Sequence, residues 1–454
     1  MQDLIVVIPG ITGTVLRRDG HDLWNLSLSA VGRGMVGFTR TAESLRLPSE
    51  IGTGSAPPAM ALEVGGLVNG WHLWPGVYGG PGYRRLLDVL TEAARGAVRT
   101  FGYDWRLSNR HTARLLAANV ERWLNDWRSS TGKADAKVIF VCHSMGGLLA
   151  RYYLEVLGGR ENARRLITLG TPYRGSVNAI RVLTGDAFSA LRPFGRQAVL
   201  TEVARSFPAL WELLPTYRCL AMPGGPVSLQ EAGLTDLPSG ALADGLSFHE
   251  EIATAVAGNS SPQYHLHAFA GKRQATWQSL ALDHGRRKYR HLQRDEDYRG
   301  DGTVPLFSAV PPEWASTEGA ICQAVRHGGL CLAAVVLDLV LDKIEPLEMG
   351  DVLSPPCELG LDLPDIAGTD EPLDIRVDSD REDLLLHVRL EDPATNQLMA
   401  EAQMMADGSG GYQASLEPIP GSWRVTVEAI AERPLVRVED LITIVATPEP
   451  STLR

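Results

Sequence analysis

The chain has 454 residues, with 43 Lys and Arg against 54 Asp and Glu, for a formal net charge of −11. This length leaves room for one large domain and a smaller one, and the acidity argues against nucleic acid as a partner. Residues 355–454 contain 20 acidic residues against 7 Arg and no Lys. The excess negative charge therefore belongs to the C-terminal hundred residues.

Cysteine usage and the apolar runs bear on the cellular compartment. The five cysteines lack a regular spacing, so neither a disulfide framework nor a metal-ligand motif is predicted. The start of the chain does not read as a signal peptide, and no uncharged apolar run approaches the roughly 18 residues that span a bilayer. We expect a cytoplasmic protein without a metal, peripheral to any membrane it meets.

Residues 1–350 alternate short apolar runs with longer amphipathic stretches, which is typical of a mostly parallel sheet flanked by helices. Strands are predicted at residues 4–8, 137–142, 166–169 and 264–270, and helices at residues 83–95, 112–127, 145–157 and 330–344. Across residues 174–259 the pattern breaks into short pieces punctuated by Pro and Gly. This segment indicates a cap or lid over the sheet.

A different pattern follows residue 350. Residues 351–372, which include Ser354-Pro355-Pro356, are interpreted as a linker. Residues 373–448 show period-two alternation with Gly- and Pro-rich turns, which favours a small all-β, sandwich-like accessory domain.

The sharpest local signal surrounds Ser144. An apolar strand at residues 138–142 is followed by His143, Ser144, Met145 and then Gly146-Gly147 at the start of a helix. This is the pattern of a nucleophile elbow, in which a tight turn lifts a serine out of the sheet toward a base. The alternative is that Ser144 only caps the helix.

The elbow pattern expects a glycine two residues before the serine, and Cys142 occupies that place. We interpret Cys142 as a buried core residue and not as a second nucleophile.

A serine nucleophile of this kind needs an acid and then a histidine later in the chain. Asp301 lies between two glycines, and His327 lies in a similar Gly-rich loop before the last helix. Asp301 would orient the imidazole of His327, which would take the proton of Ser144. The competing acids Asp295 and Asp297 and the competing bases His284 and His291 rank below this pair.

The oxyanion hole is expected to combine the N–H of Met145 with an N–H from the loop at residues 9–13, donated by Ile11 or, as its rival, Thr12. A Gly-rich phosphate loop is the competing interpretation of residues 9–13, but the lysine that such a loop needs is missing.

Several further motifs occur together with the elbow, and in this combination the chain resembles the lecithin:cholesterol acyltransferase branch of the α/β-hydrolases. The motifs are Pro9 to Gly13, Tyr103-Asp104-Trp105-Arg106, Gly170-Thr171-Pro172, Ser206-Phe207-Pro208, Leu213-Leu214-Pro215 and Gly300 to Val304. The resemblance covers residues 3–345. It does not extend to residues 360–454.

The resemblance implies an α/β-hydrolase fold, an acyl-ester substrate that is often a lipid, a cap that moves at interfaces, and no cofactor. It supports Ser144, Asp301 and His327 as the triad and places Trp24 as a candidate substrate-wall residue. Among the apolar residues of the cap, Phe207 and Trp211 are candidates for binding acyl chains.

The working hypothesis is a serine carboxylic-ester hydrolase of the lipase or phospholipase type, with acyl transfer to an alcohol as the nearest variant. The alternative is a regulated or inactive hydrolase scaffold, whose acidic C-terminal β-domain mainly docks a protein partner.

Overall fold

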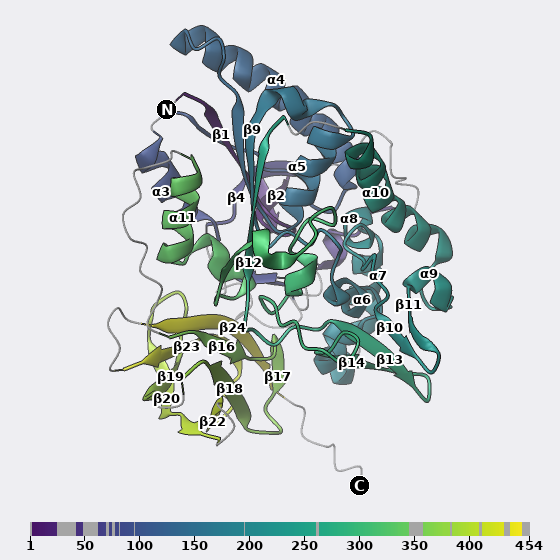
Figure 1. Cartoon of the computed structure of the whole chain (residues 1–454). Helices are drawn as coiled ribbons and strands as arrows, with labels where there is room; N and C mark the ends of the chain where they lie inside the picture. The colour runs from purple at the N-terminus through teal and green to yellow at the C-terminus, as the bar shows by residue number, and fades with distance from the viewer. Residues whose placement is uncertain are drawn as a thin grey trace.

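A six-stranded parallel sheet forms the centre of the computed structural model (Figure 1), in the order β15-β12-β9-β8-β1-β7. The strands are β1 (Leu4–Ile8), β7 (Val98–Thr100), β8 (Val138–His143), β9 (Ala163–Leu169), β12 (His265–Gly271) and β15 (Ile321–Gln323). The structure describes residues 2–24, 42–48, 62–69, 72–74, 78–80, 82–94, 96–194, 196–259, 263–344, 357–381, 384–407, 411–430 and 436–446.

Both faces of this sheet are buried, because alternate residues of β1 enter two different hydrophobic clusters. Leu4 and Val6 pack with residues of α4 (Asn109–Thr131) and α5 (Met145–Glu155). Ile5 and Val7 pack with residues of α3 (Arg84–Ala93) and α11 (Ala334–Ile344) on the other face. The continuous apolar runs of the sequence therefore correspond to strands that are covered by helices on both sides.

The predicted strands and helices of this layer are confirmed, with two differences. The three-residue strands β7 and β15 lack a recognisable run of their own and are held by pairing with β1 and β12. The helix predicted from residue 330 begins as the 3-10 turn η5 (His327–Cys331), and the regular helix α11 starts only at Ala334. This turn brings His327 to the end of the sheet.

The predicted cap segment, residues 174–259, is mainly helical. It contains α6 (Val177–Leu183), η2 (Asp186–Phe194), α7 (Gln197–Arg205), α8 (Pro208–Trp211), α9 (Leu229–Ala232) and α10 (Ser239–Gly258), together with β10 (Leu220–Met222) and β11 (Gly225–Val227). β10 pairs with β13 (Ser279–Asp283), which pairs with β14 (Arg286–Arg290). The cap sheet thus includes strands beyond residue 259, and the bounds of a cap unit remain a proposal.

Smaller elements complete the body of the protein. They are β2 (Thr14–Arg18), β3 (His21–Trp24), β4 (Glu63–Leu67), β5 (His72–Trp74) and β6 (Tyr78–Gly80), and the 3-10 turns η1 (Gly159–Asn162), η3 (Leu306–Ser308) and η4 (Thr317–Gly319). β2 pairs with β3 and β4 directly after the loop at residues 9–13. This pairing supports one end of that loop.

The C-terminal region forms two sheets around a separate hydrophobic cluster, here called the C-terminal sandwich (residues 357–446). One sheet contains β16 (Leu359–Asp362), β18 (Leu373–Ser379), β22 (Gly411–Leu416) and β21 (Met405–Ala406). The other contains β17 (Ile366–Gly368), β24 (Arg437–Val445), β23 (Gly421–Ala429), β19 (Leu386–Glu391) and β20 (Leu398–Gln403). An all-β C-terminal region is confirmed.

The predicted linker at residues 351–372 is corrected in part. Residues 351–356 lie outside the described residues, but β16 and β17 lie inside the predicted linker and pair with β18 and β24. Both strands are short, and each is stabilised by a partner that is distant in sequence, so local alternation did not reveal them. The division into domains near residue 350 remains a proposal.

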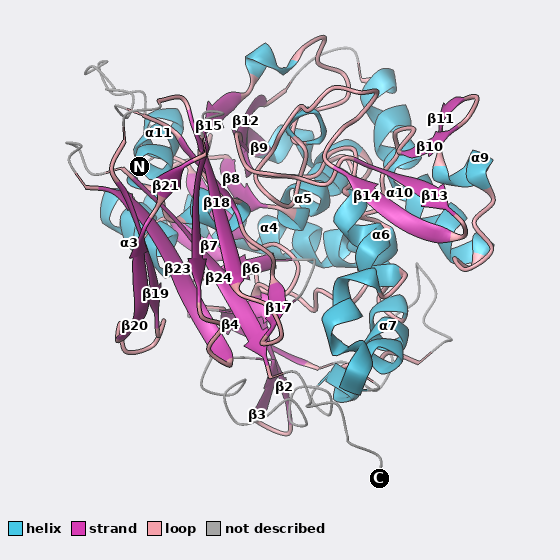
Figure 2. Cartoon of the chain, turned by 90° about the horizontal axis from the view of Figure 1, so that it is seen from below, coloured by secondary structure: helices cyan, strands magenta, loops and turns pink. Residues whose placement is uncertain are grey.

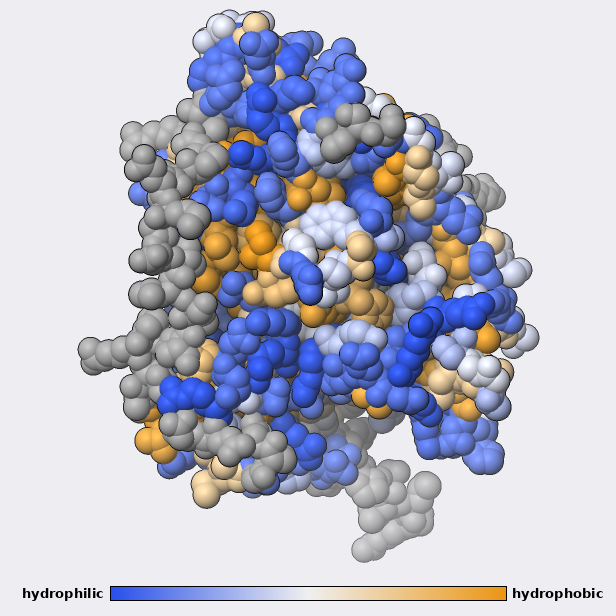
Figure 3. Space-filling model, in the orientation of Figure 1, coloured by the Kyte–Doolittle hydropathy of each residue, from blue (hydrophilic) through white to orange (hydrophobic). Residues whose placement is uncertain are grey.

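The sandwich strands β23 and β19 lie on one side of the molecule and α6, α7 and β14 on the other (Figure 2), while β17 of the sandwich contacts η2 of the cap. On the face shown in Figure 3, hydrophobic residues appear in scattered groups between hydrophilic ones. Within the described ranges, none of the helices has the length and apolar character needed to cross a bilayer.

Candidate active site

Ser144 stands at a strained turn between β8 and α5, with φ of 52° and ψ of −127°. A non-glycine residue adopts positive φ only where the surroundings enforce it. The Ser144 N–H donates to the carbonyl of Leu169 on the neighbouring strand, at 2.9 Å. Among the described residues, the Ser144 side chain makes no capping hydrogen bond to α5. The geometry therefore favours the elbow over the helix cap.

The glycines after Ser144 allow the turn to pack tightly. A Cβ on Gly146 would lie 2.5 Å from the carbonyl oxygen of Pro9, and one on Gly147 would lie 2.0 Å from the Thr171 hydroxyl. Cys142 faces the core, fully buried in the cluster beneath α4 and α5. Burial raises the pKa of its thiol well above the ordinary value. Cys142 is thus an inert core residue, as expected.

Asp301 and His327 form a buried pair. Asp301 Oδ2 lies 2.6 Å from His327 Nδ1, and their side chains are 0% and 3% exposed. The other carboxylate oxygen accepts hydrogen bonds from the N–H groups of Thr303 and Val304, at 2.9 and 2.6 Å. The His327 N–H donates to the Asp301 carbonyl at 2.8 Å. The acid is therefore fixed in position by its own loop.

Asp301 and His327 pack against Gly170, which is close to Ser144 because Ser144 is hydrogen-bonded to the preceding residue, Leu169. A Cβ on Gly170, the residue after Leu169, would lie 2.9 Å from Asp301 Oδ2 and 3.0 Å from His327 Nδ1. The rings of His327 and His143, the residue before Ser144, have centroids 4.8 Å apart. The three predicted residues thus lie at the same end of the sheet, close to the ends of β8, β12 and β15.

The competing residues make other contacts. Asp297 accepts a hydrogen bond from Gln278 at 2.6 Å and pairs with Arg299. The side chain of His284 is 96% exposed, and His291 packs against Trp277 with ring centroids 4.0 Å apart. Asp295 is exposed at a positive-φ turn.

The loop at residues 9–13 forms a turn closed by a hydrogen bond from Gly13 N–H to the Gly10 carbonyl, at 3.1 Å. The Gly10 N–H donates to the Tyr83 hydroxyl at 2.8 Å. Within the described part of the chain, the N–H groups of Ile11 and Thr12 take no part in these two hydrogen bonds. Met145 begins α5, so its N–H has no intrahelical acceptor. The candidate oxyanion donors thus lie on two adjacent turns.

A chain of hydrogen bonds runs behind the candidate triad and was not predicted. The Tyr83 hydroxyl lies 2.9 Å from His143 Nδ1, and His143 Nε2 lies 3.2 Å from the carbonyl oxygen of His327. Because the Gly10 N–H donates to Tyr83, the phenol proton is available to donate to His143. That assigns the His143 proton to Nε2. His143 was visible beside Ser144, but no sequence signal linked it to Tyr83.

Residues 83–231 match the family model described as lecithin:cholesterol acyltransferase. Over this segment the chain resembles the lecithin:cholesterol acyltransferases, and its parallel sheet flanked by helices has the α/β-hydrolase fold. Among curated proteins, the chain is 33% identical over 89 residues to an uncharacterized protein of Saccharomyces cerevisiae. That match covers 20% of the chain and only 12% of the yeast protein.

Solved structures that are similar to this chain include a complex and a lipase. A chain of the Tle4–Tli4 complex matches with 16% identity and a TM-score of 0.50, covering 75% of our chain and 98% of that one. The lipase BlEst2 of Bacillus licheniformis, in its propeptide form, matches with 13% identity and a TM-score of 0.32, covering 97% and 92%.

The three predicted substrate-contacting residues of the α/β-hydrolase are buried. Trp24 is 0% exposed and donates its indole N–H to the Thr12 carbonyl at 2.8 Å, so it supports the loop at residues 9–13. Phe207 packs edge-on against Trp105, and the Trp211 indole donates to the Arg205 carbonyl. Substrate contact for these residues remains a prediction.

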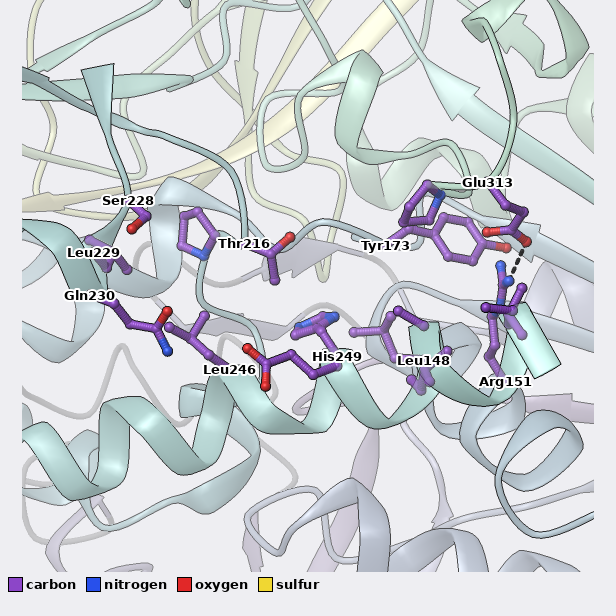
Figure 4. Close-up of a pocket in the computed structure, with 17 residues that line it drawn as sticks. Leu148, Arg151, Tyr173, Thr216, Ser228, Leu229, Gln230, Leu246, His249 and Glu313 are labelled. Atoms are coloured by element: carbon purple, nitrogen blue, oxygen red, sulfur yellow. Dashed lines mark hydrogen bonds and ion pairs between the residues drawn. The ribbon is translucent and has the colours of Figure 1, made fainter. Parts of the chain in front are cut away.

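An elongated pocket of about 460 Å³ lies between α5 and α10 (Figure 4). Arg151, Tyr173 and Glu313 lie at one end of the view, and Ser228 and Gln230 at the other. Its walls also include Leu148, Leu246, Ile252, Ala253 and Val256. Leu148 is on α5, one helical turn after Ser144. Of the lining residues, Pro215 belongs to a motif named from the sequence, but none was predicted to contact the substrate.

Beside this pocket, a buried ionic network attaches the cap to α4. The carboxylate of Glu212 accepts hydrogen bonds from Ser108 Oγ at 2.5 Å and from the Asn109 N–H at 2.7 Å, and pairs with Arg110 at 3.2 Å. Burial raises the pKa of Glu212 to about 7, and the hydrogen bonds and Arg110 oppose this effect. Arg110 also forms an ion pair with Glu251 on α10, at 2.8 Å.

Proposed function

We propose that this α/β-hydrolase is a serine carboxylic-ester hydrolase that acts on lipid or phospholipid acyl esters. The observation that carries the proposal is the buried contact of 2.6 Å between Asp301 and His327, next to a serine held at positive φ. A carboxylate that holds one imidazole nitrogen leaves the other nitrogen to act as a base.

In the first half-reaction, Ser144 Oγ attacks the ester carbonyl carbon while His327 Nε2 takes the hydroxyl proton. Asp301 stabilises the imidazolium, and the N–H groups of Met145 and of Ile11 or Thr12 stabilise the oxyanion. The C–O bond to the alcohol then breaks, and the alcohol leaves with the proton from His327. Water attacks the acyl-Ser144 ester in the second half-reaction, releasing the carboxylic acid.

We further propose that the pocket between α5 and α10 receives the apolar part of the substrate. Its walls are mainly aliphatic, and Leu148 connects it to the helix that begins after Ser144. An alcohol that reaches the acyl-enzyme in place of water would yield a new ester, which is the acyltransferase variant.

The experiment is product analysis with a phosphatidylcholine in mixed micelles, with and without added alcohol. We expect free fatty acid without the alcohol, a share of new ester with it, and neither product with Ser144→Ala. Persistence of products with Ser144→Ala would overturn the proposal.

The alternative, a scaffold that docks a protein partner through its C-terminal sandwich, is favoured by one observation. Several large apolar side chains of the sandwich are exposed, namely Leu385, Leu398, Met399, Met405 and Ile430. Under this alternative, Ser144→Ala would retain the biological function of the chain, whereas the hydrolase proposal requires its loss.

A further inference from the structure

The loops that carry Asp301 and His327 are both attached to the C-terminal sandwich. β16 and β24 lie close to the end of β12 in Figure 1. Both loops pass this end, because a Cβ on Gly271, the last residue of β12, would lie 2.4 Å from Asp301 Cβ and 2.4 Å from the Val325 carbonyl oxygen. Two side chains of the α/β-hydrolase body, those of Arg326 and Gln274, reach across to these strands. Arg326 is the residue before His327, and Gln274 contacts the residue before Asp301.

Arg326 makes two contacts with the sandwich. Its Nε lies 2.5 Å from Asp440 Oδ2 on β24, and its Nη1 donates to the Leu361 carbonyl on β16 at 2.6 Å. The side chains of Arg326 and Asp440 are only 12% and 13% exposed. A Cβ on Gly302 would lie 3.1 Å from Arg326 Nη2, so the guanidinium also passes over the Asp301 loop.

Gln274 makes a second attachment with its fully buried amide. The amide oxygen accepts from the Leu361 N–H at 2.7 Å, and Nε2 donates to the Leu359 carbonyl at 3.1 Å. The Gln274 N–H donates to the Gly300 carbonyl at 3.0 Å. Gln274 therefore links the backbone of β16 to the backbone of the Asp301 loop.

We propose that the C-terminal sandwich positions the Asp301 and His327 loops of the active site, through Arg326 and Gln274. The inference rests on the proposed function. A loop supported by a packed sheet keeps its side chain in one geometry, and displacements near 1 Å at a reacting group can cost about a hundredfold in rate. Arg326, Gln274 and Asp440 are thus positioning residues, because they act through Asp301 and His327.

The test uses the full-length chain and a fluorophosphonate probe, followed by intact mass over time. We expect Arg326→Gln to lower the first-order rate of Ser144 labelling about 30-fold, with the probe concentration for half-maximal rate within about twofold of wild type. Asp440→Asn, which is isosteric and keeps one acceptor, should cost about fivefold. The double variant should resemble Arg326→Gln, because one interaction is removed in both.

Arg389→Gln is the matched control, since Arg389 forms its ion pairs with Glu428, at 2.7 Å, and with Glu391, at 3.7 Å, both within the sandwich. Its labelling rate should stay within about twofold of wild type. Hydrogen exchange should accelerate at residues 324–332 in Arg326→Gln while α5 is unchanged. If Arg326→Gln does not fold, Asp440→Asn decides the result.

The positioning role would be overturned if folded Arg326→Gln is labelled at the wild-type rate, or if Asp440→Asn is when Arg326→Gln does not fold. Either result would leave the proposed function intact. A wild-type chain that the probe does not label, or a Ser144→Ala chain that it still labels, would overturn the proposed function itself.

Discussion

Asp301→Asn tests the assigned acid, and its effect can be worked out from the contacts of the carboxylate. Asp301 Oδ1 accepts two backbone N–H groups, so an asparagine must keep its carbonyl oxygen on that side. Its NH₂ group would then face His327 Nδ1, which becomes an acceptor with its proton on Nε2. His327 would hold the wrong tautomer and could not accept the proton of Ser144.

The expected magnitude follows from the charge pair that forms during acylation. Opposite charges with nearest atoms 2.6 Å apart attract by roughly 6 kcal/mol at an effective dielectric constant of about 20. An amide rotated so that its oxygen faces His327 would recover part of this attraction but would lose the two backbone hydrogen bonds. We therefore expect a loss of roughly 4 kcal/mol, or about a thousandfold in kcat/KM.

The assay is hydrolysis of a soluble p-nitrophenyl ester. Asp297→Asn provides the control, because Asp297 bonds Gln278 and Arg299 and not His327, and its rate should stay within about twofold of wild type. An Asp301→Asn protein that folds and hydrolyses the ester at the wild-type rate would refute the reasoning.

Three further predictions concern the surroundings of the site. Tyr83→Phe keeps the ring but removes the hydroxyl between Gly10 and His143, so kcat should fall about tenfold at unchanged KM. Tyr153→Phe, at a buried tyrosine on α5, serves as the control. An equal loss of kcat in both variants would contradict this role of Tyr83. Ala253→Trp fills the pocket between α5 and α10. Because each displaced methylene costs about 0.8 kcal/mol, the variant should lower kcat/KM for long-chain esters at least tenfold more than for acetyl esters. Equal losses of kcat/KM for both esters would show that the pocket holds no acyl chain. The pKa of Glu212 is raised in the folded state, so the contribution of Glu212 to the free energy of unfolding is complete below the ordinary carboxyl pKa. This contribution declines by roughly 3 kcal/mol as the pH rises through about 7. In urea titrations between pH 4.5 and 8, Glu212→Gln should remove this loss of stability, and an unchanged pH profile would contradict the assignment.

The sequence predicted those features whose causes are local. The apolar run before Ser144 and the paired glycines after it specify a strand, a tight turn and a helix, and the structure has all three. The Gly-flanked Asp301 and the Gly-rich loop of His327 were also recognisable, because such loops have distinctive composition. Their convergence follows from the parallel sheet, which brings strand ends to one edge.

Long-range contacts could not be predicted in the same way. Tyr83 reaches His143 from 60 residues away, and no local pattern marks a tyrosine before a helix as part of a site. No sequence pattern distinguished Arg326 from other arginines, because its partner Asp440 lies in the C-terminal sandwich, outside the residues that the family resemblance covers. The basic run at residues 286–290 forms strand β14, and Arg287 and Lys288 of this strand form ion pairs with nearby acidic residues.

The most direct test of the central claim is the intact mass of the chain after incubation with a fluorophosphonate in detergent micelles, for wild type and Ser144→Ala. The account predicts one adduct on wild type, mapped by peptide sequencing to Ser144, and none on the variant. An adduct that persists on Ser144→Ala, or a wild-type chain that stays unmodified, would contradict the assignment of Ser144 as an activated nucleophile.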